Sequence, residues 1–197
     1  MTASSATSIV IAEDEAIIRL DLRELLEEEG YLVVGEAGRG DQAVELVRSL
    51  RPDLVILDVK MPGMDGIEAA RIITAEGICA VLMLTAFSQR EIVEQARDAG
   101  AVAYLVKPYQ KAELVPAIEL ATARYAETKA LLAEVGELTE RLEVRKLLDR
   151  AKGKLIDGHG LSESDAFAFI QKTAMSTRAT MRGVAESVLK GEIVPPA

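Results

Sequence analysis

Residues suited to chemistry follow short apolar runs in the N-terminal part of the sequence. Glu13 and Asp14 follow the first run, and Asp58, Thr85 and Lys107 follow three later ones. Carboxylates gathered in one place suit a hard divalent cation such as Mg²⁺, which binds oxygen ligands. A hydroxyl and an ammonium beside them suit the anionic oxygens of a phosphoryl group. Acids and lysines are common at strand ends, and Asp58 alone could simply cap the next helix. This chemistry therefore requires the chain to bring all five residues together.

The apolar runs predict five buried strands that alternate with helices. The strands are expected at residues 8–12, 31–35, 54–57, 79–84 and 103–106. Such alternation is typical of an α/β fold with a doubly wound parallel sheet. In these sheets ligands bind outside the carboxyl ends of the strands, where the five candidate residues are expected to meet. Apolar residues at helical spacing, including Ile92, Val93 and Ala96, predict the core faces of the helices.

Composition and charge limit the classes of protein to consider. With 49% hydrophobic and 28% charged residues, this 197-residue chain has the composition of a folded protein. A single cysteine and a short polar start predict a cytoplasmic protein, and no apolar run approaches the roughly 18 residues of a membrane span. Residues 1–144 hold 14 Lys and Arg against 26 Asp and Glu, whereas residues 145–197 hold 9 against 6. The acidic body and basic tail therefore predict different partners.

Four motifs resemble those of the receiver domain of two-component response regulators, over residues 8–122. They are Ala12-Glu13-Asp14, Asp58-x-x-x-Pro62-x-x-Asp65-Gly66, Thr85-Ala86 and Lys107-Pro108. The resemblance implies a sheet with the strand order 2-1-3-4-5 and a receiver domain at residues 1–122. It implies that Asp58 accepts a phosphoryl group from a sensor histidine kinase. It also implies that Mg²⁺ binds Glu13, Asp14, Asp58 and the backbone carbonyl of Lys60.

The same resemblance implies a switch. Lys107 and Thr85 would contact the phosphoryl oxygens, and Tyr104 would rotate inward behind Thr85. Tyr104 is also explained as a partly buried strand aromatic, and both interpretations stay open. The Lys107-Pro108 peptide bond is expected to be cis, against a base rate of about 5% for such bonds.

A helical connector follows, from Lys111 to about residue 156. Pro116 is expected to bend this helix or to shift its start. Within the connector proper, residues 123–142, the spacing of three and four residues resembles a short coiled-coil seam formed by Thr128, Leu131, Val135, Leu138 and Leu142. A dimerising coiled coil and a helix packed on its own chain are both consistent with this pattern.

Residues 143–197 predict a small all-α domain of three helices. The second is expected to start at Ser162 and the third at Ser176 or Thr177, with Phe167 in the core. Its basic residues suggest nucleic acid. A helix-turn-helix would place Arg178 and Arg182 near a DNA major groove, whereas RNA would be bound by its exposed loops and backbone. The residues alone leave DNA and RNA open.

Three further motifs, over residues 138–190, resemble the ANTAR family of RNA-binding antitermination domains. They are Asp149-Arg150-Ala151-Lys152-Gly153-x-Leu155, Ser162-x-x-x-Ala166-Phe167-x-x-Ile170-x-x-x-Ala174-Met175, and Val184-Ala185. The resemblance implies homodimers that bind hairpin RNA, with an RNA-facing surface formed by Arg145, Arg150, Ala151, Lys152, Gly153, Arg178 and Arg182. Lys154 departs from the family pattern, so the core is looser there or Lys154 contacts a phosphate. The whole chain is predicted to be a response regulator without a separate catalytic domain.

Overall fold

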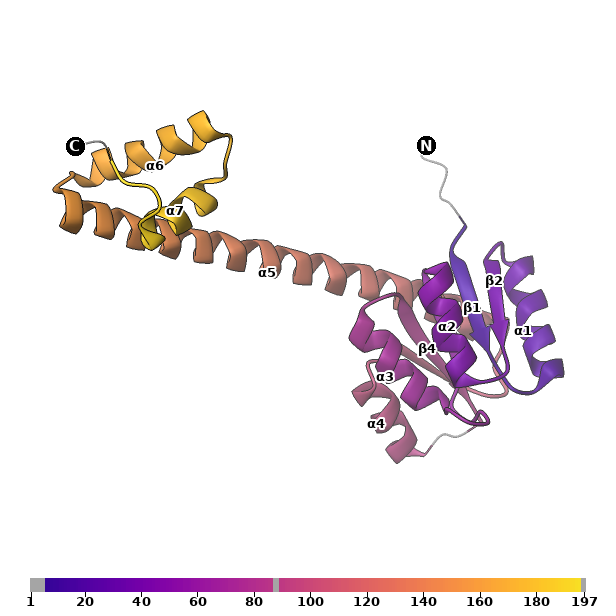
Figure 1. Ribbon diagram of the computed structural model, residues 1–197. Helices are drawn as coiled ribbons and strands as arrows, with labels where there is room; N and C mark the ends of the chain where they lie inside the picture. Colours follow the sequence, from indigo (N-terminus) through magenta and orange to yellow (C-terminus); the bar gives the residue numbers. More distant parts are fainter. Residues whose placement is uncertain (1–5, 87–88, 196–197) are drawn as a thin grey trace. The chain divides into compact units, whose positions relative to one another are not determined.

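The computed structural model describes residues 6–86 and 89–195, which form five strands and seven helices (Figure 1). The strands are β1 (Ser8–Ala12), β2 (Leu32–Ala37), β3 (Leu54–Asp58), β4 (Ala80–Thr85) and β5 (Ala103–Val106). The helices are α1 (Ala16–Glu28), α2 (Gly40–Leu50), α3 (Gly66–Glu76), α4 (Arg90–Asp98), α5 (Lys111–His159), α6 (Glu163–Thr177) and α7 (Met181–Lys190). The chain divides into two compact units. The first ends at Lys129 and the second begins at Ala130. No helix in the described part of the chain is both long and apolar enough to cross a membrane.

The strands form one parallel sheet in the order β2-β1-β3-β4-β5, which confirms the predicted fold. The central strand β3 places Leu54 opposite Ile9 of β1 and Ala80 of β4. Every residue of β3 and β4 is buried, as expected for parallel strands that are covered on both faces. Because all five strands run the same way, their carboxyl ends lie along one edge of the sheet.

Helices cover both faces of this sheet (Figure 1). Val55 and Met83 belong to a core with α2, α3 and α4 on one face. Ile56 and Leu82 belong to a second core with α1 and the start of α5 on the other face. Successive strand residues point to opposite faces, so an uninterrupted apolar run supplies both cores.

Two details of the first unit differ from the sequence expectation. β2 extends to Ala37, beyond the predicted end at residue 35, because Ala37 still pairs with Ala12 of β1. Val93 was expected in the core but is 37% exposed. Helix α4 instead buries Ala96 and packs Ile92 at the margin of the core, and this orientation leaves Val93 near the surface.

Helix α5 begins at Lys111, as expected, and continues through Pro116, so of the two effects expected of Pro116 a shifted start does not occur. The carbonyl of Gln110 accepts hydrogen bonds from the first turn, at distances of 2.9 and 3.0 Å. Pro116 lacks the N–H that would bond one turn back. Fully buried Leu114 and Ile118 lie on either side of Pro116, and their packing holds the helix on the sheet across that missing bond.

Tyr125 attaches α5 to the first unit beyond the part of the helix that is buried against the sheet. The Tyr125 hydroxyl donates a 2.6 Å hydrogen bond to the carbonyl of Gly77, in the connection between α3 and β4. The Lys129 ammonium lies 5.8 Å from the centre of the Tyr125 ring, within the range of a cation–π contact. Helix α5 therefore contacts the rest of the first unit as far as Tyr125, one turn before that unit ends at Lys129.

In the second unit, α6 and α7 pack against the C-terminal part of α5 as a three-helix bundle (Figure 1). Its buried core consists of Ala151, Leu155, Ala166, Ile170, Ala174, Val184, Ala185 and Val188. The Ser162 hydroxyl accepts a 3.1 Å hydrogen bond from the Asp165 amide, so α6 starts at the predicted cap.

The start of α7 differs from the prediction, which placed it at Ser176 or Thr177. Thr177 is the last residue of α6, and Arg178 ends that helix in a left-handed conformation with φ 54°. Thr180 caps α7 by accepting a 3.1 Å hydrogen bond from the Gly183 amide. The hydroxyl of Thr177 bonds back within α6, which removes it as a cap for the next helix.

Candidate functional site

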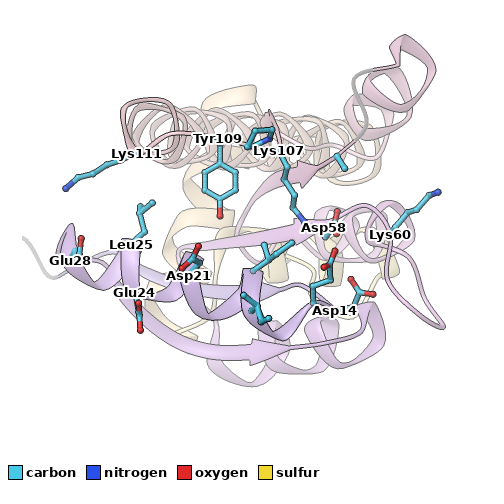
Figure 2. Close-up of a pocket in the computed structure, with 15 residues that line it drawn as sticks. Asp14, Asp21, Glu24, Leu25, Glu28, Asp58, Lys60, Lys107, Tyr109 and Lys111 are labelled. Carbon is cyan, nitrogen blue, oxygen red and sulfur yellow. Dashed lines mark hydrogen bonds and ion pairs between the residues drawn. The ribbon is translucent and has the colours of Figure 1, made fainter.

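The five side chains predicted to form a site converge at the carboxyl edge of the sheet, and Figure 2 labels Asp14, Asp58 and Lys107 among them. Glu13 and Asp14 follow β1, Asp58 and Thr85 end β3 and β4, and Lys107 follows β5. Glu13, Asp58 and Thr85 are buried, with 1%, 8% and 0% of their surface exposed, whereas Asp14 is exposed. Burying carboxylates is costly without a positive partner, and Lys107 supplies one.

Lys107 forms ion pairs with two buried carboxylates. Its ammonium lies 3.0 Å from Asp58 Oδ2 and also contacts Glu13 Oε2. Burial by itself would lower the pKa of Lys107, but hydrogen bonds to Glu13 and Asp58 outweigh it and raise that pKa. Burial raises the pKa of Glu13, although the contact with Lys107 opposes the rise. Lys107 is therefore charged at neutral pH and lies beside Asp58.

The acids also form a group able to hold a cation. One carboxylate oxygen from each of Glu13, Asp14 and Asp58 lies within 4.8 Å of the others. Hard oxygen donors of this kind fit Mg²⁺, which retains several waters and so requires a solvent-facing side. The exposed Asp14 provides that side. The predicted ligand role of the Lys60 carbonyl stays a prediction; Lys60 lines the same groove.

A groove of about 900 Å³ opens beside these acids (Figure 2). Its walls are α1 and the segment from Lys107 to Lys111, and Asp58 lies within it. Ile17 of α1 lines the groove and is 83% exposed. No residue of α1 was predicted to belong to the site. An isoleucine on a helix face otherwise rich in acids is the signal that would have indicated a contact surface there.

Tyr104 is partly buried on β5 and packs against the core on the α2–α4 face of the sheet. Tyr104 pairs with Met83 of β4, and Met83 lies two residues before Thr85. The side chains of Tyr104 and Thr85 therefore lie on the same face of the sheet. Burial raises the pKa of Tyr104. Its role as a switch stays a prediction. The Lys107-Pro108 bond is cis, as expected.

The loop after β3 returns close to Asp58 at Gly66. The Gly66 amide donates a 2.9 Å hydrogen bond to the carbonyl of Val59, and the Asp65 side chain caps α3 by accepting from Glu68 N at 2.8 Å. A Cβ on Gly66 would lie 1.8 Å from the carbonyl oxygen of Asp58. Only glycine therefore allows α3 to start this close to the end of β3.

We predict that Gly66→Ala lowers the free energy of unfolding by about 1–3 kcal/mol, because the backbone at Asp58 must move to admit the methyl group. Gly136→Ala is the matched control. Gly136 faces open space within α5, so its substitution is expected to stabilise the helix by up to about 1 kcal/mol. Urea unfolding followed by circular dichroism compares the two. A Gly66→Ala protein as stable as the wild type would contradict the packing argument.

In the second unit, the residues predicted to face RNA have different environments. Arg145, Arg150 and Arg178 are exposed, and none of them takes part in an ion pair among the described residues. Ala151 was predicted to face RNA but is fully buried. The helix face that carries Ala151 also carries Leu155, and packing against α6 and α7 encloses both.

Two predicted RNA contacts are tied to acids within the bundle. Lys152 lies 2.9 Å from both Asp149 and Glu163, which raises its pKa. Arg182 forms an ion pair with Glu186 in its own helix, at 3.1 Å. Gly153 is partly buried and has open space where a side chain would extend.

Lys154 makes a contact that neither of its two explanations included, and both explanations stay predictions. Its ammonium donates a 2.7 Å hydrogen bond to the carbonyl of Leu189, in the last turn of α7. A cation at a helix C-terminus satisfies carbonyls that lack partners within the helix and interacts favourably with the helix dipole. Lys154 therefore links α5 to the end of α7.

Comparison with known families identifies both units. Residues 9–119 match the response regulator receiver domain, and residues 136–189 match the ANTAR domain. The chain belongs to the response regulators and combines a receiver domain with an ANTAR output domain. These are signalling and RNA-binding domains, and neither is a typical catalytic domain.

Among its relatives is the transcriptional regulatory protein PdtaR of Mycobacterium tuberculosis. The two are 59% identical over 182 residues, which cover 92% of this chain and 89% of that protein. The chemotaxis protein CheY of Bacillus subtilis is 39% identical over 57% of this chain and 95% of its own length. The solved receiver domain of the putative response regulator NarL from Mycobacterium tuberculosis has a TM-score of 0.59 and 32% identity, and covers 61% of this chain and 98% of that structure.

Proposed function

We propose that this protein is a cytoplasmic response regulator that accepts a phosphoryl group on Asp58 and acts through RNA. The donor would be the phosphohistidine of a sensor kinase, and the output would be transcription antitermination. The observation that carries the proposal is the buried pairing of Asp58 with Lys107, beside Glu13 and Asp14. The same chain carries an ANTAR domain and is similar to a transcriptional regulatory protein.

In the proposed transfer, a carboxylate oxygen of Asp58 attacks the phosphorus of the phosphohistidine. The phosphorus–nitrogen bond breaks, the imidazole leaves, and an aspartyl phosphate forms. Lys107 neutralises charge on the transferred oxygens from its place 3.0 Å from Asp58. Thr85, at the end of β4, would contact the same oxygens. Bound Mg²⁺ would supply further neutralisation, held by Glu13, Asp14 and Asp58.

Asp58→Asn is expected to abolish phosphorylation, because an amide oxygen is a far weaker nucleophile than a carboxylate. Incubation with Mg²⁺ and acetyl phosphate, followed by phosphate-affinity electrophoresis, measures the modified fraction. Asp98→Asn is the matched control, since Asp98 is exposed and pairs with Arg97 of the same helix, α4. Equal modification of the wild type and Asp58→Asn would disprove the assignment of Asp58.

For the output, the described contacts favour RNA over DNA. A helix-turn-helix would present Arg178 and Arg182 to a major groove. Arg178 instead ends α6 in a left-handed conformation, and Arg182 pairs with Glu186. Arg150 is exposed on α5, away from that turn, and takes part in no ion pair among the described residues. This exposed cation of α5, together with the ANTAR match, favours RNA, although Arg178 in the turn is also exposed and takes part in no ion pair among the described residues.

Arg150→Ala is therefore expected to weaken binding of hairpin RNA by roughly three- to tenfold and to reduce the salt dependence by about one phosphate contact. Gel shifts with a pool of hairpins at several salt concentrations measure both. Lys172→Ala, an exposed lysine of α6, is the control and should leave binding unchanged. Duplex DNA competing as well as hairpin RNA would support the DNA-binding alternative instead.

A homodimer through α5 completes the proposal. Leu131, Val135, Leu138 and Leu142 are between 52% and 59% exposed, at the spacing of a coiled-coil seam. A row of exposed apolar residues on one helix face is typical of an interaction surface. A second copy offers the same row, and two copies would bury both.

We predict that Leu138→Lys combined with Leu142→Lys converts the phosphorylated protein from a dimer to a monomer, because the seam is too short to bury four charges. Light scattering after size-exclusion chromatography measures the mass. Leu132→Lys is the control: Leu132 is 67% exposed on α5 but lies off the seam. An unchanged mass for the double variant would exclude this dimer surface.

A further inference from the structure

A concave surface formed by α5 and α6 holds the side chain of Phe167. The hollow has a volume of about 340 Å³ and is lined by Arg141, Val144, Arg145, Leu148, Asp149, Lys152 and Phe167. We call it the Phe167 pocket. Phe167 was expected in the core but is 43% exposed. Its neighbour Ala166 and Ile170 one turn later fill the core of the bundle, which directs Phe167 to the edge of α6.

Cations surround this exposed aromatic side chain. Arg145 takes part in no ion pair among the described residues, whereas Arg141 pairs with Glu137 at 2.6 Å. Lys152 is held by acids of α5 and α6. Three cations and a single acid, Asp149, line the pocket, so its lining carries a net positive charge.

The remaining walls of the pocket are apolar and partly covered. Val144 and Leu148 lie on α5 at intermediate exposure, and Leu148 packs against the bundle core. A hollow with an aromatic side, an aliphatic floor and a cationic rim fits a flat, polarisable ring attached to an anionic backbone. An unpaired nucleobase has this chemistry, since bases stack on aromatic side chains while Arg and Lys neutralise the phosphates.

We propose that the Phe167 pocket receives one unpaired loop base of a hairpin RNA, stacked on the ring of Phe167, with Arg145 contacting the adjacent phosphate. This rests on the proposed RNA-binding function and deepens it, because it assigns a base-binding subsite to the domain. A second copy of the chain fits the pocket less well. In a two-fold dimer the same surface meets itself, so the net positive linings would repel each other.

The pocket lies mainly to one side of the proposed dimer seam on α5. Arg141 and Leu148 lie about a quarter of a turn around the helix from the line of Leu138 and Leu142, whereas Arg145 lies near the continuation of that line. A dimer formed through the seam therefore does not require Phe167. Changes at Phe167 can accordingly be tested for RNA binding while the mass of the protein is measured independently.

Full-length protein with Mg²⁺ and beryllofluoride, titrated against hairpins with randomised loops, provides the test. Phe167→Leu removes the aromatic ring and keeps apolar bulk, so we expect binding at least about tenfold weaker. Phe167→Tyr keeps a stacking ring and is expected to remain within about twofold of the wild type. Met175→Ala is the control for an exposed apolar residue of the same helix, because Met175 is 73% exposed and lies outside the pocket.

The outcomes separate this inference from the function on which it rests. Wild-type protein that binds no hairpin would overturn the proposed RNA output, and the subsite with it. Wild-type binding that Phe167→Leu leaves unchanged would overturn only the subsite. A lower mass for Phe167→Leu in light scattering would assign Phe167 to a contact between copies instead, and would also overturn it.

Photocrosslinking of the wild type gives a readout that does not depend on any variant folding. Hairpins carry 5-iodouridine either in the loop or in the stem, and mass spectrometry of the digested complex locates the crosslink. We expect the loop label to crosslink to the peptide that contains Phe167 and the stem label not to do so. Loop crosslinks confined to other peptides would overturn the subsite.

Discussion

The ammonium of Lys107, held between Asp58 and Glu13, is the interaction on which the first unit's site depends. It allows two carboxylates to be buried at one edge of the sheet, where neither would be stable as a lone charge. With Asp14 beside them, three acids still outnumber one base, and the excess negative charge favours a divalent cation. Phosphorylation would replace the single negative charge of the Asp58 carboxylate with the nearly two charges of an aspartyl phosphate, so the same imbalance would make the site sensitive to modification.

The parallel sheet makes this arrangement possible. Residues from β1, β3, β4 and β5, far apart in the chain, meet because every strand delivers its last residue to the same edge. The backbone around them is closely packed, as the contact between Gly66 and the Asp58 carbonyl demonstrates. A rigid scaffold of this kind holds the acceptor and its counter-charge at fixed distances, which is what phosphoryl transfer requires of a protein.

The second unit uses its charges differently. Several of its cations are already bound to acids, among them Lys152 and Arg182, so an RNA must compete with Glu163 or Glu186 for them. Arg145 and Arg150 are exposed and take part in no ion pair among the described residues. The same helix, α5, presents an apolar face to the first unit's core, an exposed seam in its middle and a core face to the bundle. Its sequence carries all three functions in one continuous helix, in which Pro116 removes a single backbone hydrogen bond.

The sequence by itself determined the fold of the first unit and the residues of its site. Apolar runs and the residues that end them are local features, and parallel topology brings strand ends together whatever the detailed packing. Tertiary structure alone decided that Ala151 is buried, that Phe167 is exposed and that Lys154 binds the end of α7. The reason is that all three lie in a small bundle. There the environment of a helical residue depends on which of two other helices covers it, and helical spacing within one segment does not specify that.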